Sequence, residues 1–205
     1  MTSRTNPSLP LSRWRAKGIM QELRMHDLRF DEDTTEAYLS QLQVHLGQAD
    51  ISSLTKKTEG WAAGLQLAGL SLKRSSNQAA FVHSFKGSNR FILDYLTDEV
   101  VNALPETSYL FLLKTSILER FFALLAEVLT EQAQTAKTLQ ALDAANLFLV
   151  PLDQERRWYR YHHLFADLLR HRLKEVLSEE DVRMLKQKAS DWFLQENLIQ
   201  SCRMP

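Results

Sequence analysis

The chain of 205 residues contains one cysteine, Cys202, and carries no net charge. A single cysteine excludes an internal disulfide and a cysteine-rich metal site, and it fits a reducing cytoplasm best. Because 25 basic residues balance 25 acidic ones, no overall field attracts the chain to DNA or to a membrane. No apolar run approaches the ~20 residues that span a bilayer, and the first residues have no signal-peptide core. We therefore expect a cytoplasmic protein.

The sequence also lacks the parts that phosphoryl transfer requires. The pattern Gly-x-x-x-x-Gly-Lys-[Ser/Thr], which cradles phosphates, is absent, and no hydrophobic strand ending in paired acids precedes Arg4. The histidines have no serine or cysteine nucleophile arrangement beside them, and the acids occur at helix starts and on polar faces. We therefore predict a protein that is not an enzyme, with no catalytic residue and no metal site.

The first half of the chain predicts a small helical domain at residues 31–104. Asp31 or Asp33 can cap its first helix, and Gly60 breaks the chain between its second and third helices. Before it, residues 1–30 are irregular, with a helical turn near 11–17 and a short strand at 19–24. The helices are expected at 31–44, 52–58, 61–73, 77–85 and 89–104.

The second half has the order of a winged-helix domain, which we place at residues 105–177. Three helices are followed by two short strands rich in aromatic and aliphatic residues, with a turn at 153–155 between them. The helices are expected at 106–116, 121–130 and 134–145, and the strands at 147–150 and 158–161. Another helix runs from about 162 to 177, and Ser178 caps a last one that ends near 196. The predicted fold class is therefore mainly α with one β-hairpin.

Two adjacent histidines begin the helix at 162–177. At ~100° per residue His162 falls on the apolar face of this helix and His163 falls opposite, so the pair does not form a metal site. His162 therefore points inward at a helix start, where anions are favoured, and one interpretation is that this junction forms part of a functional site. The alternative is a hydrogen-bonded core histidine. The apolar face consists of Leu164, Phe165, Leu168, Leu169, Leu173 and Val176.

Four segments in a fixed order resemble one family. They are residues 4–13, residues 22–30, residues 59–67 (Glu-Gly-Trp-Ala-Ala-Gly-Leu-Gln-Leu) and residues 159–165 (Tyr-Arg-Tyr-His-His-Leu-Phe). Together they resemble the large LuxR-family transcriptional activators of the MalT type, which are signal-transduction ATPases with numerous domains (STAND ATPases). The resemblance covers nearly the whole chain, roughly residues 2–200.

The resemblance implies a chain of domains of which this sequence is an internal fragment. Family members have a nucleotide-binding domain, a helical domain, a winged-helix domain, a sensor of repeated helix pairs and a C-terminal helix-turn-helix. Residues 1–30 would be a remnant of the nucleotide-binding core, and 178–205 the start of a truncated helical-repeat sensor. Both the phosphate-binding loop and the C-terminal helix-turn-helix would be missing, so DNA would be bound only through that missing domain.

The resemblance also implies nucleotide-binding residues. Arg4 matches a sensor arginine that feels the γ-phosphate, while Gly60 and Trp61 match a motif at the base and ribose, with Ala62 where proline is expected. His162 matches a histidine near the β-phosphate of ADP, and His163 stands where that motif has aspartate. The alternatives are a solvated arginine, a helix breaker with a core tryptophan, and a core histidine. ATP or ADP is the cofactor of the intact family, and we expect neither to bind tightly to this chain.

Three functions follow from these observations. The first is a nucleotide-switch module of a transcription regulator without ATPase activity of its own. The second is a protein–protein interaction fragment that associates with another domain or with itself, and the third is a winged-helix DNA binder. The third winged-helix segment, residues 134–144, has one lysine against one aspartate, which makes a poor phosphate binder. A basic cluster follows it, formed by Arg156, Arg157, Arg160, Arg170, Arg172 and Lys174.

Overall fold

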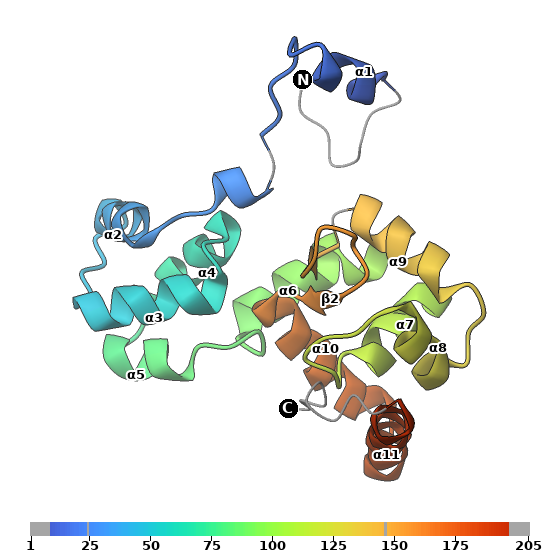
Figure 1. Cartoon of the computed structure of the whole chain (residues 1–205). Coiled ribbons are helices and arrows are strands. Elements are labelled where there is room, and N and C mark those ends of the chain that lie inside the picture. The colour runs from blue at the N-terminus through green and yellow to red at the C-terminus, as the bar shows by residue number, and fades with distance from the viewer. Residues whose placement is uncertain (1–8, 24, 146, 197–205) are drawn as a thin grey trace. The chain divides into compact units, whose positions relative to one another are not determined.

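The computed structural model describes residues 9–23, 25–145 and 147–196. It is mainly helical with one antiparallel hairpin (Figure 1), which confirms the predicted fold class. The chain divides into two compact units, residues 1–86 and residues 87–205. In the described ranges no helix is long and apolar enough to cross a membrane. Arg4 lies outside these ranges.

The chain before the first unit's core begins with helix α1 (Leu11–Ala16), as predicted, and later forms the 3-10 helix η1 (Met25–Leu28). The strand predicted at 19–24 is wrong for residues 19–23, and Arg24 is not described. Ile19 donates its amide to the carbonyl of Trp14 instead, and the side chains of Ile19 and Leu23 are 69% and 70% exposed. Without a neighbouring strand or a core to cover it, a lone apolar segment cannot form a sheet.

Within the described residues, four helices form the core of the first unit. They are α2 (Glu32–Gln41), α3 (Gln48–Thr58), α4 (Ala62–Leu72) and α5 (Gln78–Ser84). Asp31 caps α2 by accepting the amide of Thr34 at 2.8 Å, as predicted. Helix α3 begins four residues earlier than expected, because the carbonyl of Gly47 accepts the amides of Asp50 and Ile51 and opens the helix without a side-chain cap. The sequence signals for a helix cap come from side chains. The start of α3 is formed by a backbone carbonyl alone, so these signals do not reveal it.

The core of the first unit is mostly aliphatic. Helix α3 packs against α2, α4 and α5, and α2 also contacts α4. A methyl group at Gly69 would lie 2.6 Å from Cδ1 of Leu42, so glycine permits this close approach. The buried apolar side chains are Leu39, Val44, Ile51, Leu54, Leu65, Ala68, Leu72, Val82 and Phe85.

The second unit has the winged-helix order that the sequence predicts. It consists of α6 (Arg90–Glu99), η2 (Val101–Ala103), α7 (Glu106–Thr115), α8 (Ala123–Thr130), α9 (Thr135–Ala144), β1 (Leu149–Pro151), β2 (Tyr159–Tyr161), α10 (His163–Val176) and α11 (Glu179–Gln195). Strands β1 and β2 pair antiparallel with Leu149 opposite Tyr161. Phe121, between α7 and α8, exchanges both backbone hydrogen bonds with Tyr159, which adds a bridge to the hairpin.

Helix α6 differs from its prediction in length and in place. It ends at Glu99 and is followed by η2, whereas a single helix was expected over 89–104. We assigned it to the helical domain, but it lies in the second unit, where it contacts α10. Ile92 and Leu96, one turn apart, are fully buried, so this face of α6 forms part of the second core.

Helix α11 closes the second unit. Ser178 caps it in a capping box with Asp181, as the sequence indicates. Leu185, Ala189 and Phe193 form its buried stripe, and the helix contacts α8 and α10. Such a stripe at four-residue spacing is the face that an amphipathic helix turns toward a core.

Candidate functional site

The junction between β2 and α10 places His162 inside the second unit and His163 at its surface. His162 is only 2% exposed, while His163 is exposed. The backbone amide of His162 donates to the carbonyl of Phe148 at 2.8 Å, and the carbonyl of His162 accepts the amide of Ala166 at 2.9 Å. His162 therefore caps α10, which starts one residue later than predicted. The opposite orientation of the two histidines is confirmed.

A chain of aromatic rings extends from the His162 imidazole. The imidazole meets the ring of Phe148 edge-on, with centroids 5.8 Å apart, and Phe148 lies 5.4 Å from Phe165. The ring of Tyr161 lies 5.9 Å from Phe165 and 5.0 Å from Phe121. Rings at such distances attract each other, and this attraction adds to the stabilisation that comes from their buried area. The imidazole thus lies at one end of a packed aromatic cluster that joins the hairpin to α10.

A buried hydroxyl pair fixes this cluster to α7. The hydroxyl groups of Tyr161 and Thr115 are 2.6 Å apart, and Thr115 also donates to the carbonyl of Phe111 at 2.8 Å. Because the one proton of the threonine hydroxyl is used there, Tyr161 donates to Thr115. Burial raises the pKa of Tyr161 far above its usual value, so the phenol stays neutral. The pair therefore joins β2 to the C-terminal end of α7.

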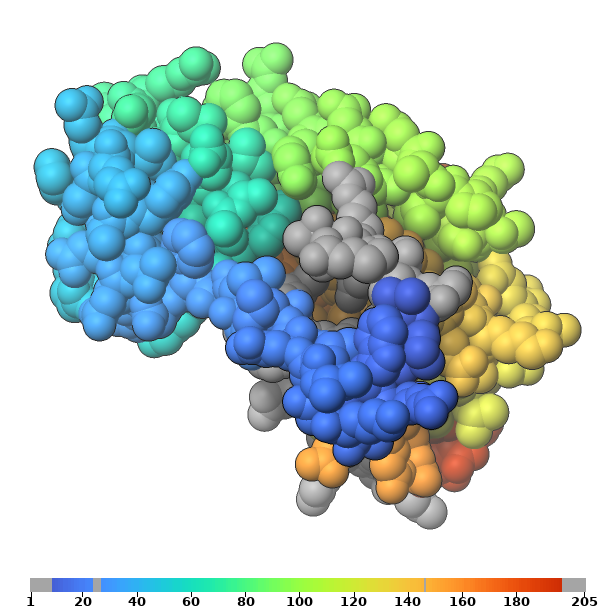
Figure 2. Space-filling view, turned by 90° about the horizontal axis from the view of Figure 1, so that it is seen from above, coloured from blue at the N-terminus to red at the C-terminus, as the bar shows by residue number. Residues whose placement is uncertain are grey.

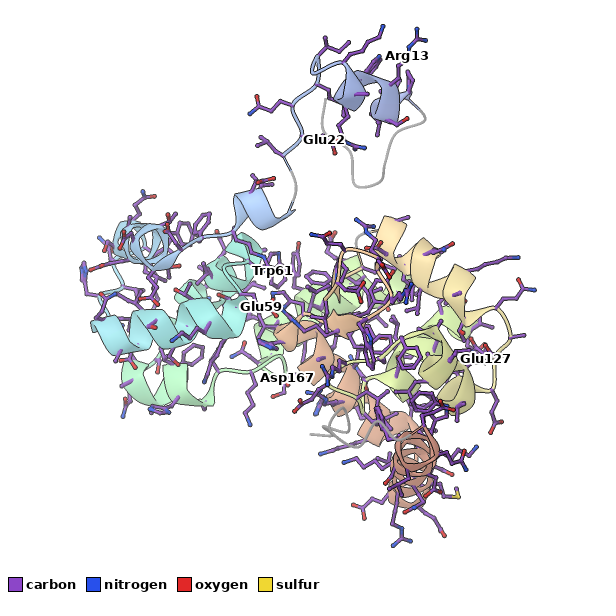
Figure 3. The ribbon with its side chains drawn as sticks, viewed as in Figure 1. Arg13, Glu22, Glu59, Trp61, Glu127 and Asp167 are labelled. Atoms are coloured by element: carbon purple, nitrogen blue, oxygen red, sulfur yellow. The ribbon has the colours of Figure 1, made fainter. Side chains whose placement is uncertain are left out.

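An ion pair connects the first turns of α10 to two other segments. Arg170 donates to the carbonyl of Ser116 at 2.9 Å and lies 3.6 Å from a carboxylate oxygen of Asp167. The other oxygen of Asp167, labelled in Figure 3, accepts the amide of Gly87 at 3.2 Å. Burial lowers the pKa of Arg170, and the carboxylates of Asp167 and Glu119 oppose that shift. Sequence reasoning missed this connection, although the i, i+3 spacing of Asp167 and Arg170 was visible.

The turn between α3 and α4 in the first unit contains Gly60 and Trp61. Gly60 has a left-handed backbone with φ +68°, so it ends α3 as predicted. A methyl group there would overlap the carbonyl oxygen of Phe30. Trp61 is the N-cap of α4 and is half-buried, so it is not a fully buried core anchor. Figure 3 shows Trp61 beside Glu59, whose carboxylate is 3.5 Å from Arg29.

The backbone groups of this turn already form hydrogen bonds within the first unit. Gly60 donates to Thr55 at 3.1 Å and accepts from Phe30 at 2.9 Å, and Trp61 donates to Thr58 at 2.9 Å. A nucleotide at this turn would therefore meet the half-exposed ring of Trp61 rather than a free amide. At His162 the helix start favours an anion, but the 2% exposure keeps the ring from solvent. The chemistry at His162 fits a phosphate, and access to it requires that the ring be uncovered.

The basic cluster in the winged-helix half is largely neutralised by acids. Arg156 pairs with Asp143, and Arg157 lies 2.7 Å from Glu155. Arg172 lies 2.9 Å from Glu175, and Arg170 pairs with Asp167 as described above. Guanidinium groups held by carboxylates release few counterions on meeting DNA, so they add little affinity.

Helix α9 occupies the position of a reading helix, and its surface is poor in groups that read bases. The helix is yellow in Figure 2 and reaches the surface there. Its exposed residues are Ala136, Lys137, Gln140, Ala141 and Ala144, so Lys137 and Gln140 are the two of them that can read bases. Its one lysine, Lys137, bonds to the side chain of Gln134 at 3.1 Å. Base recognition needs Arg, Lys, Asn or Gln directed at the groove, so this surface does not favour the DNA-binding alternative.

The chain is similar to two kinds of larger protein. The serine/threonine-protein kinase PknK of Mycobacterium tuberculosis (strain ATCC 25618 / H37Rv) is 32% identical over 200 residues, covering 97% of this chain and 18% of that protein. The HTH-type transcriptional regulator MalT of Yersinia enterocolitica is 32% identical over 195 residues, covering 94% and 22%. MalT of Vibrio cholerae is 29% identical over 195 residues, covering 94% and 22%. The chain thus spans about a fifth of the length of these relatives.

A family of domains matches the second unit. The MalT winged helix domain corresponds to residues 97–181, a range that begins inside α6 and ends in the first turn of α11. It contains the three helices, the hairpin and α10 with the buried His162. The match thus starts eight residues before the domain that we predicted at 105–177. Residues 97–181 therefore belong to the MalT winged helix domain family, and the chain as a whole is similar to MalT over more than nine-tenths of its length.

Proposed function

We propose that this chain is the nucleotide-switch segment of a MalT-type transcription regulator in the cytoplasm and does not hydrolyse ATP by itself. The similarity of this chain to MalT over more than nine-tenths of its length supports a role in a transcription regulator. The absence of the Gly-x-x-x-x-Gly-Lys-[Ser/Thr] pattern from the sequence supports the proposal that the chain does not hydrolyse ATP. The observation that carries the proposal is the burial of His162 at the start of α10, next to an exposed His163.

The proposed roles follow from the chemistry of each residue. A bound nucleotide supplies negative phosphate oxygens and a planar base. His162 places an imidazole where the first amides of α10 already favour an anion. Trp61 offers a half-exposed ring for stacking, and Gly60 forms the turn that presents it. Arg4, by resemblance, carries the guanidinium that recognises the terminal phosphate.

We propose that this chain alone binds ADP or ATP weakly. The described residues offer a covered imidazole and a half-exposed ring, and a tight phosphate site needs several converging donors. Calorimetry with magnesium and either nucleotide, up to millimolar concentration, should show no saturable heat. Micromolar binding to the chain would contradict this part of the proposal.

The switch role is tested by replacing the matching segment of a relative with this chain. The residues of Yersinia enterocolitica MalT that align with this chain would be replaced by it, and reporter transcription would be measured with ADP or ATP supplied. We expect transcription by the chimaera to depend on which nucleotide is present. A matched chimaera that carries only residues 97–181 separates the contribution of the winged-helix domain. A soluble chimaera that binds nucleotide but whose transcription ignores its identity would contradict the proposal.

A protein-interaction role is supported by one surface feature. Leu124 and Val128, one turn apart on α8, are 63% and 38% exposed. Exposed apolar side chains at this spacing favour contact with another protein domain or a second copy. We expect the variant Leu124→Glu with Val128→Glu to reduce any self-association seen by sedimentation. Glu127→Gln, an exposed change on the same helix, is the control. Unchanged self-association in the double variant would show that α8 is not the interaction surface.

A further inference from the structure

The chain leaves the first unit and enters the second through one exposed residue. Phe85 is 2% exposed and Gly87 is buried, whereas Lys86 between them is exposed. The division between the two units falls between Lys86 and Gly87. Each neighbour of Lys86 is fastened to its own unit by contacts that can be named.

The anchor on the first side is the end of α5. Lys57 donates its ammonium group to the carbonyls of Val82 at 2.7 Å and His83 at 2.6 Å. A cation at a helix C-terminus satisfies the last carbonyls and complements the helix dipole. The buried ring of Phe85 lies 5.6 Å from that of Phe81. The chain is therefore held in the first unit up to Phe85.

The anchor on the second side is Gly87 itself. Its amide donates to Asp167 at 3.2 Å, and Asp167 is held by Arg170. A methyl group at this position would overlap the carbonyl oxygen of Leu164 and lie 2.7 Å from Cβ of Asp167. Gly87 has no positive φ, so glycine is required here by lack of space and not by an unusual backbone. Two residues later, Asn89 caps α6 through the amide of Phe91 at 3.1 Å.

We infer that Lys86 is a single-residue hinge between the two units, and that Gly87 is the fixed point beside it. A hinge is formed by the few residues whose φ and ψ can change without breaking packed contacts. Rotation at Phe85 would expose its ring, and rotation at Gly87 would drive it into α10. A glycine at a domain boundary suggests flexibility from sequence alone, and the packing assigns the opposite role to this one.

The hinge is tested by the distribution of distances between spin labels in the two units of the full chain. Cysteines replace the exposed residues Glu36 and Lys137, and Cys202→Ser removes the native thiol. We expect a broad distribution. Lys86→Pro should narrow it by roughly half, because proline fixes φ and leaves ψ free. Phe85, at φ −63° and ψ 121°, already has the extended backbone that a following proline requires.

Two further variants complete the experiment. Lys86→Ala changes the side chain without restricting the backbone, so the width should equal that of the parent. Asp167→Ala releases Gly87 and should widen the distribution, with thermal melting confirming that both units remain folded. A narrow distribution in the parent would overturn the hinge. An unchanged width in Lys86→Pro would overturn it as well. No widening in Asp167→Ala would show that Gly87 is not the fixed point.

Discussion

The two units bury different kinds of side chain. Phe111, Phe121, Phe165 and Phe193 are fully buried in the second unit, whereas Phe85 is the one fully buried phenylalanine among the described residues of the first. Each buried aromatic ring removes about 150–250 Å² from water and favours specific ring geometries. The second unit therefore has the more strongly specified core, and it is also the unit that carries the MalT-type domain.

Both units contain turns with left-handed backbone. In the first unit Gln43, Glu59 and Gly60 have positive φ, at 60°, 50° and 68°. The second unit has four such residues other than glycine, namely Glu131, Gln134, Phe148 and Arg156. Backbone in this region costs energy for residues other than glycine, and contacts around the turn must offset it. The carbonyl of Gly60, which accepts from Phe30, is one such contact. The comparison therefore predicts that loss of a buried ring will affect the second unit most, and that a substitution at Gly60 will affect the first unit.

Removing the central ring of the second unit should have the largest effect. Phe165→Ala deletes a fully buried side chain that touches the rings of Phe148 and Tyr161. We expect a loss of about 3–5 kcal/mol in the unfolding free energy of that unit. Hydrogen exchange with mass spectrometry would follow both units at once. Equal loss of protection in α2–α5 would show that the two units unfold together and would break the comparison.

A turn substitution should act on the first unit instead. Gly60→Ala places a residue with Cβ at φ +68° and against the carbonyl of Phe30. The left-handed backbone alone costs about 1–2 kcal/mol, and the overlap adds to it. Urea unfolding of α2–α5 should shift by at least this amount. Gly47→Ala is the control, since no atom lies within 4 Å of the added methyl group. Equal effects of the two variants would contradict the account of the turn.

The hydroxyl pair between β2 and α7 should contribute less. Tyr161→Phe removes the hydrogen bond to Thr115 and should cost about 1 kcal/mol in the second unit. The effect depends on pH, because the folded-state pKa of Tyr161 is raised above its usual 10.0. Its contribution is present below pH 10 and falls as pH rises further, since unfolding then releases the phenolic proton. Stability curves from pH 8 to 11 should be flatter for Tyr161→Phe than for the parent. Parallel curves would contradict this burial.

The sequence predicted the second unit more fully than the first because its signals are local. Ser178 caps α11, and the apolar face of α10 places His162 inside and His163 outside. Both signals come from residues within a few positions of each other. The runs of aromatic and aliphatic residues at 147–150 and 158–161, with the turn between them, likewise predicted the hairpin within two residues.

The parts that were missed depend on backbone or on distant contacts. The start of α3 at Gly47 rests on a carbonyl, which no side chain announces. Asp167 meets Gly87, 80 positions away in the chain, so spacing cannot reveal the contact. The pairing of Arg156 with Asp143 also follows from the folded hairpin. Of the nucleotide-binding residues, Gly60 and Trp61 lie in one unit and His162 in the other, and their common role stays a prediction.

The smallest effect is expected at the exposed turn of the hairpin. Asp153 accepts the amides of Arg157 at 2.9 Å and Trp158 at 2.8 Å, and these bonds lower the pKa of its carboxyl group. The contribution is therefore present above pH 3.8 and is lost as pH falls below it. In Asp153→Ala the amides of Arg157 and Trp158 should exchange faster, as NMR would show, while those of α10 keep their rates. Unchanged exchange at the turn would contradict the role of Asp153.

The two neighbouring histidines give the most direct test of the proposed switch. In the MalT chimaera described above, His162→Ala and His163→Ala change the same side chain on opposite faces of the start of α10. We predict that His162→Ala weakens ADP binding by tenfold or more, since a hydrogen bond to a charged group is worth about 1.5–3 kcal/mol. His163→Ala should leave it unchanged, with thermal melting confirming that both variants are folded. Equal ADP affinity in the two folded variants would contradict the account.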